Sequence, residues 1–136
     1  MSAARLDRVR GLWRAFEARD WAGAQSLLAA DAVCDWWASG ERLTGAATIV
    51  GVNAAYPEGW HIELLALDEL LDGRVHSLVR VDHGPQSFYA NSFFRFDAED
   101  RIAAIDEFWA TLEAPPAWRV GLPGVSQLTA PSVIDC

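Results

Sequence analysis

Alternating apolar and polar residues mark long strands in the second half of the chain. In residues 86–96 the even positions are apolar, with the period of two that suits one buried face of a strand: Phe88, Ala90, Phe94 and Phe96. An acidic turn over 97–100 follows, and residues 102–109 return as a strand whose two faces are both mostly apolar. Such a strand needs cover on each side, from helices, a second sheet or another subunit.

The remaining pattern predicts helices first and further strands afterwards. Apolar residues recur at helical spacing near the start, and Asp20 is placed to cap a second helix. The predicted elements are helices over 3–19, 21–30 and 44–55, and strands over 32–38, 41–43, 60–71 and 74–83. Three helices followed by a four-strand meander predict an α+β fold, with the helices packed in the concave face of a curved, mostly antiparallel sheet.

Composition narrows the class of protein. The chain has 136 residues, 51% of them hydrophobic and seven of them Trp, which indicates a folded domain with a proper core. We assign residues 1–112 to that domain, and the Pro- and Gly-rich residues 113–136 to an extended tail that packs on the same domain or on a dimer partner.

Charge and cysteine usage set further expectations. A net charge of −8 argues against a nucleic-acid or anionic-membrane partner. No apolar run approaches a membrane span, and the N-terminus lacks the features of a signal peptide. Cys34 and Cys136 lie far apart without a metal-binding spacing, which favours reduced thiols and a cytoplasmic protein.

Two local strings resemble the nuclear-transport-factor-2-like superfamily, also called SnoaL-like. They are FEARDWAGAQSLLAADAVCDWW over 16–37 and FFRFDAEDRIAAIDEFW over 93–109, and the resemblance covers about residues 5–112. It implies a cone-shaped, cystatin-like α+β fold with a pocket between the sheet and the helices, and a homodimer formed through the outer face of the sheet. The superfamily contains ketosteroid isomerases, polyketide cyclases, dehydratases and epoxide hydrolases as well as non-enzymatic binding modules, so the resemblance predicts the fold better than the activity.

The resemblance also makes some reactions of the superfamily more expected than others. The positions of the ketosteroid isomerase base and its two oxyanion donors hold Trp36, Phe16 and Ser92, so that activity is not expected. The SnoaL-type cyclases place an acid–base carboxylate on the last strand beside an aromatic residue, and Glu107 matches that position by type. An enzyme of this kind would be a cofactor-free isomerase, cyclase or lyase.

The candidate catalytic residues are therefore Glu107 with His61 or Arg80 as its partner. A carboxylate among apolar groups has a raised pKa, which suits an acid or base near neutral pH. His61 could shuttle a proton, given an ordinary pKa near about 6.5. The alternatives are that Glu107 and Arg80 form a buried structural ion pair and that His61 is a satisfied, partly buried side chain.

Large aromatic residues predict an apolar pocket, with ordinary core packing as the alternative for each of them singly. The candidate lining residues are Phe16, Trp36, Tyr56, Trp60, Ser92, Ile105 and Trp109. The histidines at 61, 76 and 83 match no compact ligand spacing, so neither a metal nor another cofactor is expected. Two hypotheses follow: a protein that binds a small hydrophobic molecule and acts on it through Glu107, or an inert ligand-binding or dimeric assembly module.

Overall fold

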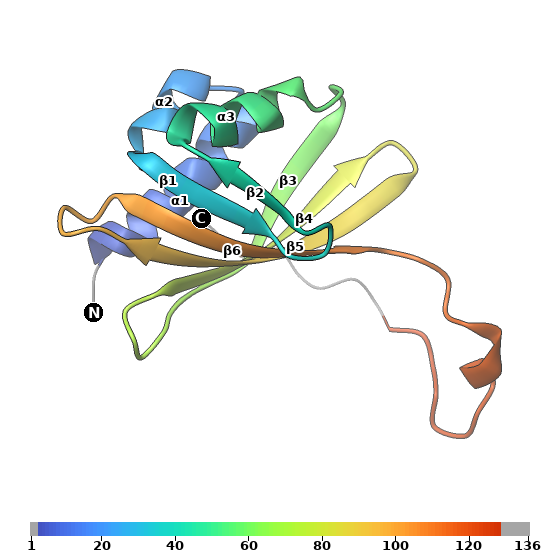
Figure 1. Ribbon diagram of the computed structural model, residues 1–136. Helices are drawn as coiled ribbons and strands as arrows, with labels where there is room; N and C mark the ends of the chain where they lie inside the picture. The colour runs from blue at the N-terminus through green and yellow to red at the C-terminus, as the bar shows by residue number, and fades with distance from the viewer. Residues whose placement is uncertain (1–2, 129–136) are drawn as a thin grey trace.

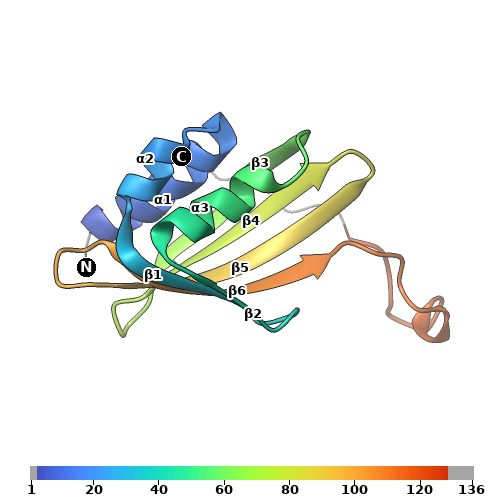
Figure 2. The same cartoon turned by 45° about the horizontal axis from the view of Figure 1, so that its top comes forward.

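One curved sheet carries three α-helices on one of its faces in the computed structural model, which describes residues 3–128 (Figures 1 and 2). The helices are α1 (Ala3–Ala18), α2 (Trp21–Ser26) and α3 (Ala46–Ala55). The strands are β1 (Leu28–Trp36), β2 (Glu41–Thr44), β3 (Trp60–Glu69), β4 (Val75–His83), β5 (Gln86–Phe96) and β6 (Ile102–Thr111). The predicted α+β class and the placement of the helices are confirmed.

The strands lie in the order β2-β1-β6-β5-β4-β3. The last four form the predicted antiparallel meander, and β1 joins its β6 edge as a parallel neighbour. β2 then pairs antiparallel with β1 at the edge of the sheet. The parallel pair brings Trp36, at the end of β1, beside Glu107 of β6.

The second helix is shorter than the sequence predicts. We expected it over 21–30 and the next strand over 32–38, whereas α2 ends at Ser26 and β1 already begins at Leu28. Leu28 and Ala29 are buried, and Leu28 pairs with Ile102. A short apolar run fits a helix or a strand equally well, and here a distant strand decides between them.

The core lies between the helices and the concave face of the sheet. α1 contributes Val9, Leu12, Trp13 and Phe16, at the spacing of one helical face. Opposite them, the even positions of β5 carry fully buried side chains at Ala90, Ser92 and Phe94. The buried Ser92 hydroxyl among these apolar residues is satisfied by a hydrogen bond to Glu107.

Beyond β6 the chain leaves the body of the molecule as an extended arm, drawn in orange-red in Figure 1. Residues 112–128 are exposed throughout and include one turn of 3₁₀ helix, Ala117–Arg119. Of the predicted tail over 113–136, residues 113–128 are described and residues 129–136 lie outside the described part of the chain. Among the described helices, none has the length and apolar character that crossing a membrane requires.

Candidate functional site

A cavity of about 580 Å³ opens between α3 and the concave face of the sheet. Its deep end is formed by buried side chains of α1, β3 and β4, namely Trp13, Trp60 and Val81. The other lining residues come from α3, the loop after it and strands β1, β3, β5 and β6: Trp36, Val52, Asn53, Ala55, Tyr56, Pro57, Ile62, Phe88, Trp109 and Thr111. None of these side chains carries a full charge, and most are apolar.

The end of α3 and the loop after it form one rim of the cavity. Val52 and Ala55 share one face of the helix, Tyr56 follows directly after it, and all three line the cavity. The helix ends at Ala55, as expected from Pro57, because the residue before a proline avoids the helical conformation. Tyr56 is accordingly extended, with ψ of 134°.

Glu107 lies behind the cavity wall and accepts hydrogen bonds from three side chains. Trp36 Nε1 and Trp109 Nε1 both donate to Glu107 Oε1, at 2.9 and 3.1 Å. Ser92, directly opposite on β5, donates to Oε2 at 2.5 Å. The two indoles pack edge to face, with interplanar angle 87°. Glu107 therefore fixes the orientation of two rings that form the wall.

Burial raises the pKa of Glu107, because removal from water disfavours the charged carboxylate. The hydrogen bonds from Ser92, Trp36 and Trp109 oppose that shift by stabilising the charge, and burial has the larger effect. The side chain is only 6% exposed, and among the described residues no cation bonds to it. The carboxyl group is thus held by neutral donors in an apolar setting.

A second polar contact crosses the same face of the sheet. Trp13 Nε1 of α1 donates to Ser77 Oγ of β4 at 3.0 Å. Ser77 pairs with Ser92 in the ladder, and Ser92 pairs with Glu107. Three neighbouring strands thus place one polar side chain each in a row, and every indole donor directed at that row comes from a cavity-lining residue.

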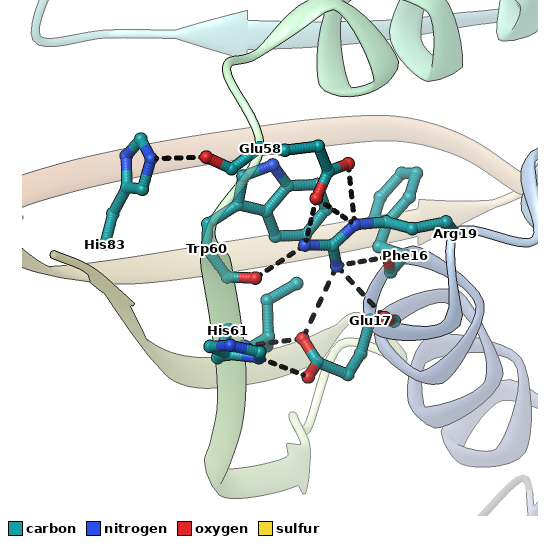
Figure 3. A network of polar contacts seen from close by, with 8 residues as sticks. Phe16, Glu17, Arg19, Glu58, Trp60, His61 and His83 are labelled. Atoms are coloured by element: carbon teal, nitrogen blue, oxygen red, sulfur yellow. Dashed lines mark hydrogen bonds and ion pairs between the residues drawn. The ribbon is translucent and has the colours of Figure 1, made fainter.

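A separate network joins the end of α1 to the start of β3 (Figure 3). Arg19 donates to the carbonyls of Phe16, Glu17 and Trp60 and to the Glu58 carboxylate. Its guanidinium also lies 3.4 Å from the centre of the Trp60 ring. The network thereby fixes the position of Trp60, whose side chain also lines the cavity.

His83 holds the loop over 56–59 from the opposite side. Its Nε2 lies 3.1 Å from the Glu58 carbonyl, and its Nδ1 lies 2.9 Å from the Tyr56 hydroxyl. The rings of Tyr56 and His83 also pack edge to face. The rim is therefore fastened to both α1 and the β4–β5 turn.

The structure does not bring the two proposed partners to Glu107. His61 is an exposed side chain that contacts Glu17, because it points away from the face shared by Trp60 and Ile62. Arg80 pairs with Asp82 and Ser87 instead. Among residues 3–128, the side chains that donate hydrogen bonds to Glu107 are those of Trp36, Ser92 and Trp109. Neither the predicted proton-transfer pair nor the alternative ion pair is formed.

The predicted lining residues divide into two layers. Trp36, Tyr56, Trp60 and Trp109 line the cavity. Phe16 and Ile105 belong to the buried core, and Ser92 bonds to Glu107 without reaching the cavity. Sequence reasoning missed nine lining residues: Trp13, Val52, Asn53, Ala55, Pro57, Ile62, Val81, Phe88 and Thr111. The helical spacing of Val52 with Ala55 and Tyr56, and the strand alternation of Ile62 with Trp60, were signals that could have identified three of them.

Comparisons with known proteins were informative only at the level of structure. No protein-family model matches the chain, and no curated protein matches it. A protein from Kribbella flavida DSM 17836, provisionally assigned as a ketosteroid isomerase, is 24% identical, with a TM-score of 0.79 over 93% of this chain and 91% of its own.

Two other solved structures are similar over most of the chain. A nuclear-transport-factor-2-like protein of unknown function from Burkholderia xenovorans LB400 has 18% identity and a TM-score of 0.76, over 93% of this chain and 96% of its own. An LEH-like epoxide hydrolase from M. tuberculosis has 16% identity and a TM-score of 0.64, over 80% of this chain and 84% of its own. The chain therefore has the nuclear-transport-factor-2-like, or SnoaL-like, fold that its sequence resembles.

Proposed function

We propose that this protein binds a small, neutral, hydrophobic molecule in the cavity between α3 and the sheet. The observation that carries the proposal is the cavity itself, whose volume of about 580 Å³ lies within the usual range for small-molecule sites. A void of that size lined by aromatic side chains loses packing contacts, and a bound molecule restores them.

The lining argues for a neutral ligand. No charged side chain of residues 3–128 lines the cavity, and the carboxyl group of Glu107 is already engaged by three donors behind the wall. A charged ligand would lose its hydration without gaining a counter-charge, which is costly in an apolar site. The aromatic walls favour flat or ring-containing molecules.

Narrowing the mouth of the cavity is expected to weaken binding of a polycyclic probe. Ala55→Phe places a ring on the lining, whereas Ala54→Phe places the same ring on an exposed neighbouring position that does not line the cavity. We expect pyrene to quench the tryptophan fluorescence of the natural protein, and Ala55→Phe to raise its dissociation constant about tenfold through overpacking. Ala54→Phe should bind pyrene as the natural chain does.

Failure of pyrene and of a broad panel of other polycyclic and terpenoid probes to bind would contradict the pocket proposal. Equal effects of the two alanine substitutions would show instead that a probe binds elsewhere on the surface. Circular dichroism of both variants controls for a change of fold.

Proton-transfer catalysis is the second candidate function, and the raised pKa of Glu107 favours it. A neutral carboxyl group can donate a proton and later accept it, as cofactor-free isomerases, cyclases and lyases require. Glu107 is separated from the cavity by Trp36 and Trp109, so this chemistry requires one indole to release the carboxyl group when substrate binds. An inert binding module needs no such movement.

We also propose a homodimer formed through the outer face of the sheet, with the exposed arm packing on the partner. On that face Trp37 and Phe108 stack at an interplanar angle of 10° and remain 57% and 45% exposed. Phe93 packs against Phe108 edge to face. Clustered exposed aromatic side chains of this kind mark association surfaces. The arm adds further exposed apolar side chains at Trp118, Val120 and Leu122.

Phe108→Glu is expected to convert the dimer to a monomer, because it places a charge in the centre of the proposed interface. Light scattering at micromolar concentration should give twice the chain mass of 14.9 kDa for the natural protein and about that mass for the variant. The matched control is Leu71→Glu, which changes a fully exposed leucine in the β3–β4 turn. A natural protein that scatters as a monomer would refute the dimer.

A buried thiol is consistent with a reducing compartment, and we propose the cytoplasm. Cys34 is 3% exposed, and burial raises the pKa of its thiol. A protonated, inaccessible thiol reacts slowly with oxidants and disulfides.

A further inference from the structure

The polar groups available to a ligand lie at the mouth of the cavity and not at its deep end. The indole N–H groups of Trp13, Trp36 and Trp109 are engaged by Ser77 and Glu107. The indole nitrogen of Trp60 has no hydrogen-bond partner among the described residues, but it is buried out of reach of solvent. The lining residues with an oxygen atom on the side chain are Asn53, Tyr56 and Thr111, and Tyr56 and Thr111 are exposed. A bound molecule would therefore place its apolar end against Trp13 and Trp60 and any polar group near Tyr56.

The contacts of His83 determine what the Tyr56 hydroxyl can offer. His83 Nε2 lies 3.1 Å from the Glu58 carbonyl oxygen, which can only accept, so Nε2 carries a hydrogen. In a neutral imidazole the other nitrogen then has a lone pair. In that neutral form Nδ1, which lies 2.9 Å from Tyr56 Oη, accepts the hydroxyl hydrogen.

The Tyr56 hydroxyl oxygen, at the rim of the cavity, can then only accept a hydrogen bond from a ligand. A ligand oxygen without a hydrogen, such as that of a ketone or an ether, would meet a second acceptor there. A ligand hydroxyl or N–H group would complete a chain in which it donates to Tyr56, Tyr56 donates to His83, and His83 donates to the Glu58 carbonyl. Asn53 and Thr111 do not impose this choice. The Asn53 amide has one hydrogen engaged by the Ile49 carbonyl and keeps another hydrogen and the oxygen, and the Thr111 hydroxyl can donate as well as accept.

We propose that the molecule bound in this cavity is a hydrophobic alcohol, or another apolar molecule with one hydrogen-bond donor at its end, and that Tyr56, set by His83, selects the donor. The inference rests on the proposed binding function and adds to it the orientation and the polar group of the ligand. Tyr56 and His83 are here specificity-determining residues at the mouth, separate from Glu107 and its two indoles.

The test compares three probes of one ring system: pyrene, its hydroxymethyl derivative and the methyl ether of that derivative. Each is titrated into the full chain while tryptophan fluorescence is followed. We expect the alcohol to bind about threefold to tenfold more tightly than the ether, the range that one net hydrogen bond supplies. Tyr56→Phe keeps the ring and removes the hydroxyl, so it should bring the ratio of the two dissociation constants close to one.

The ratio between variants is the decisive quantity, because it cancels the different hydration of the two compounds. Tyr89→Phe is the matched control: Tyr89 lies beside Arg80 and does not line the cavity, so the preference for the alcohol should persist. Equal binding of alcohol and ether by the natural protein would overturn the inference while leaving the pocket intact, as would a preference that survives Tyr56→Phe. If none of the three probes binds, the proposed binding function fails for this class of ligand and the inference fails with it.

Discussion

Replacing Glu107 by alanine is expected to lower the free energy of unfolding by about 3–4 kcal/mol at pH 7. The substitution leaves the buried Ser92 and the partly buried Trp36 and Trp109 without an acceptor, and a buried unsatisfied group costs about 1–3 kcal/mol. It also opens a cavity behind the wall, while relief from burying the carboxyl group offsets part of the total. Urea unfolding followed by tryptophan fluorescence measures the difference.

Glu107→Gln is the matched control, since its amide oxygen accepts from both indoles and its amide nitrogen donates to Ser92. Because the pKa of Glu107 is raised in the folded protein, the folded chain keeps its proton above the unfolded pKa of about 4.3, where the unfolded chain releases it. The stability due to this group is therefore complete below that pH and falls as the pH rises towards the folded pKa.

Glutamine does not titrate, so the stability of Glu107→Gln relative to the natural protein should increase from pH 4 to pH 8. Comparing the two chains at each pH cancels the titration of the other carboxylates, which is essential in a protein with 19 acidic residues. A difference that does not change with pH would contradict the raised pKa. A glutamine variant as unstable as the alanine variant would contradict the role of the three hydrogen bonds.

Replacing Arg19 by alanine is expected to cost about 2–3 kcal/mol. The ion pair with Glu58 contributes little, because Glu58 is 65% exposed and such pairs are weak. The larger part comes from the charge-assisted hydrogen bonds to the carbonyls of Phe16, Glu17 and Trp60, and from the guanidinium over the Trp60 ring. Thermal and urea unfolding both report this loss.

The backbone at Arg19 supplies a matched comparison. Arg19 has φ of 60° and follows the last residue of α1, a position usually taken by glycine. Its N–H bonds to Phe16 and that of Asp20 bonds to Ala15, which together close the helix end. Arg19→Gly removes the same side chain but relieves the backbone, so it should be about 1 kcal/mol more stable than Arg19→Ala. Equal losses would show that the left-handed backbone carries no strain here.

Much of the fold could be predicted because its signals are local. The alternation in 86–96 and the turns at Gly73 and 97–100 mark the meander without knowledge of any partner. The boundary between α2 and β1 could not be predicted in this way. It depends on the pairing of Leu28 with Ile102, a contact between strands that are neighbours in the sheet but far apart in the sequence.

The candidate site shows the same division. Strand parity placed Glu107, Trp109 and Ser92 on one face correctly, and the register then made Ser92 the partner of Glu107. Parity cannot separate a side chain that lines a cavity from one buried behind it, which is why Ile105 was expected at the cavity. Residue type has the same limit, since Phe16 was expected there as a large aromatic residue. The partner of His61, Glu17, depends on how α1 meets β3. Arg80 instead pairs with Asp82 two positions along the same strand, a local contact that strand alternation could have indicated.

The parallel pairing of β1 with β6 has a consequence for biosynthesis. Trp36 and Glu107 are 71 positions apart, so a chain emerging from the ribosome completes β1 long before its neighbour exists. Closing so large a loop is entropically slow. During that delay the edge of β1 that will pair with β6 has unpaired backbone groups, which other nascent chains can bind. Premature termination anywhere before β6 would thus release a product that cannot assemble the indole wall and is prone to aggregate.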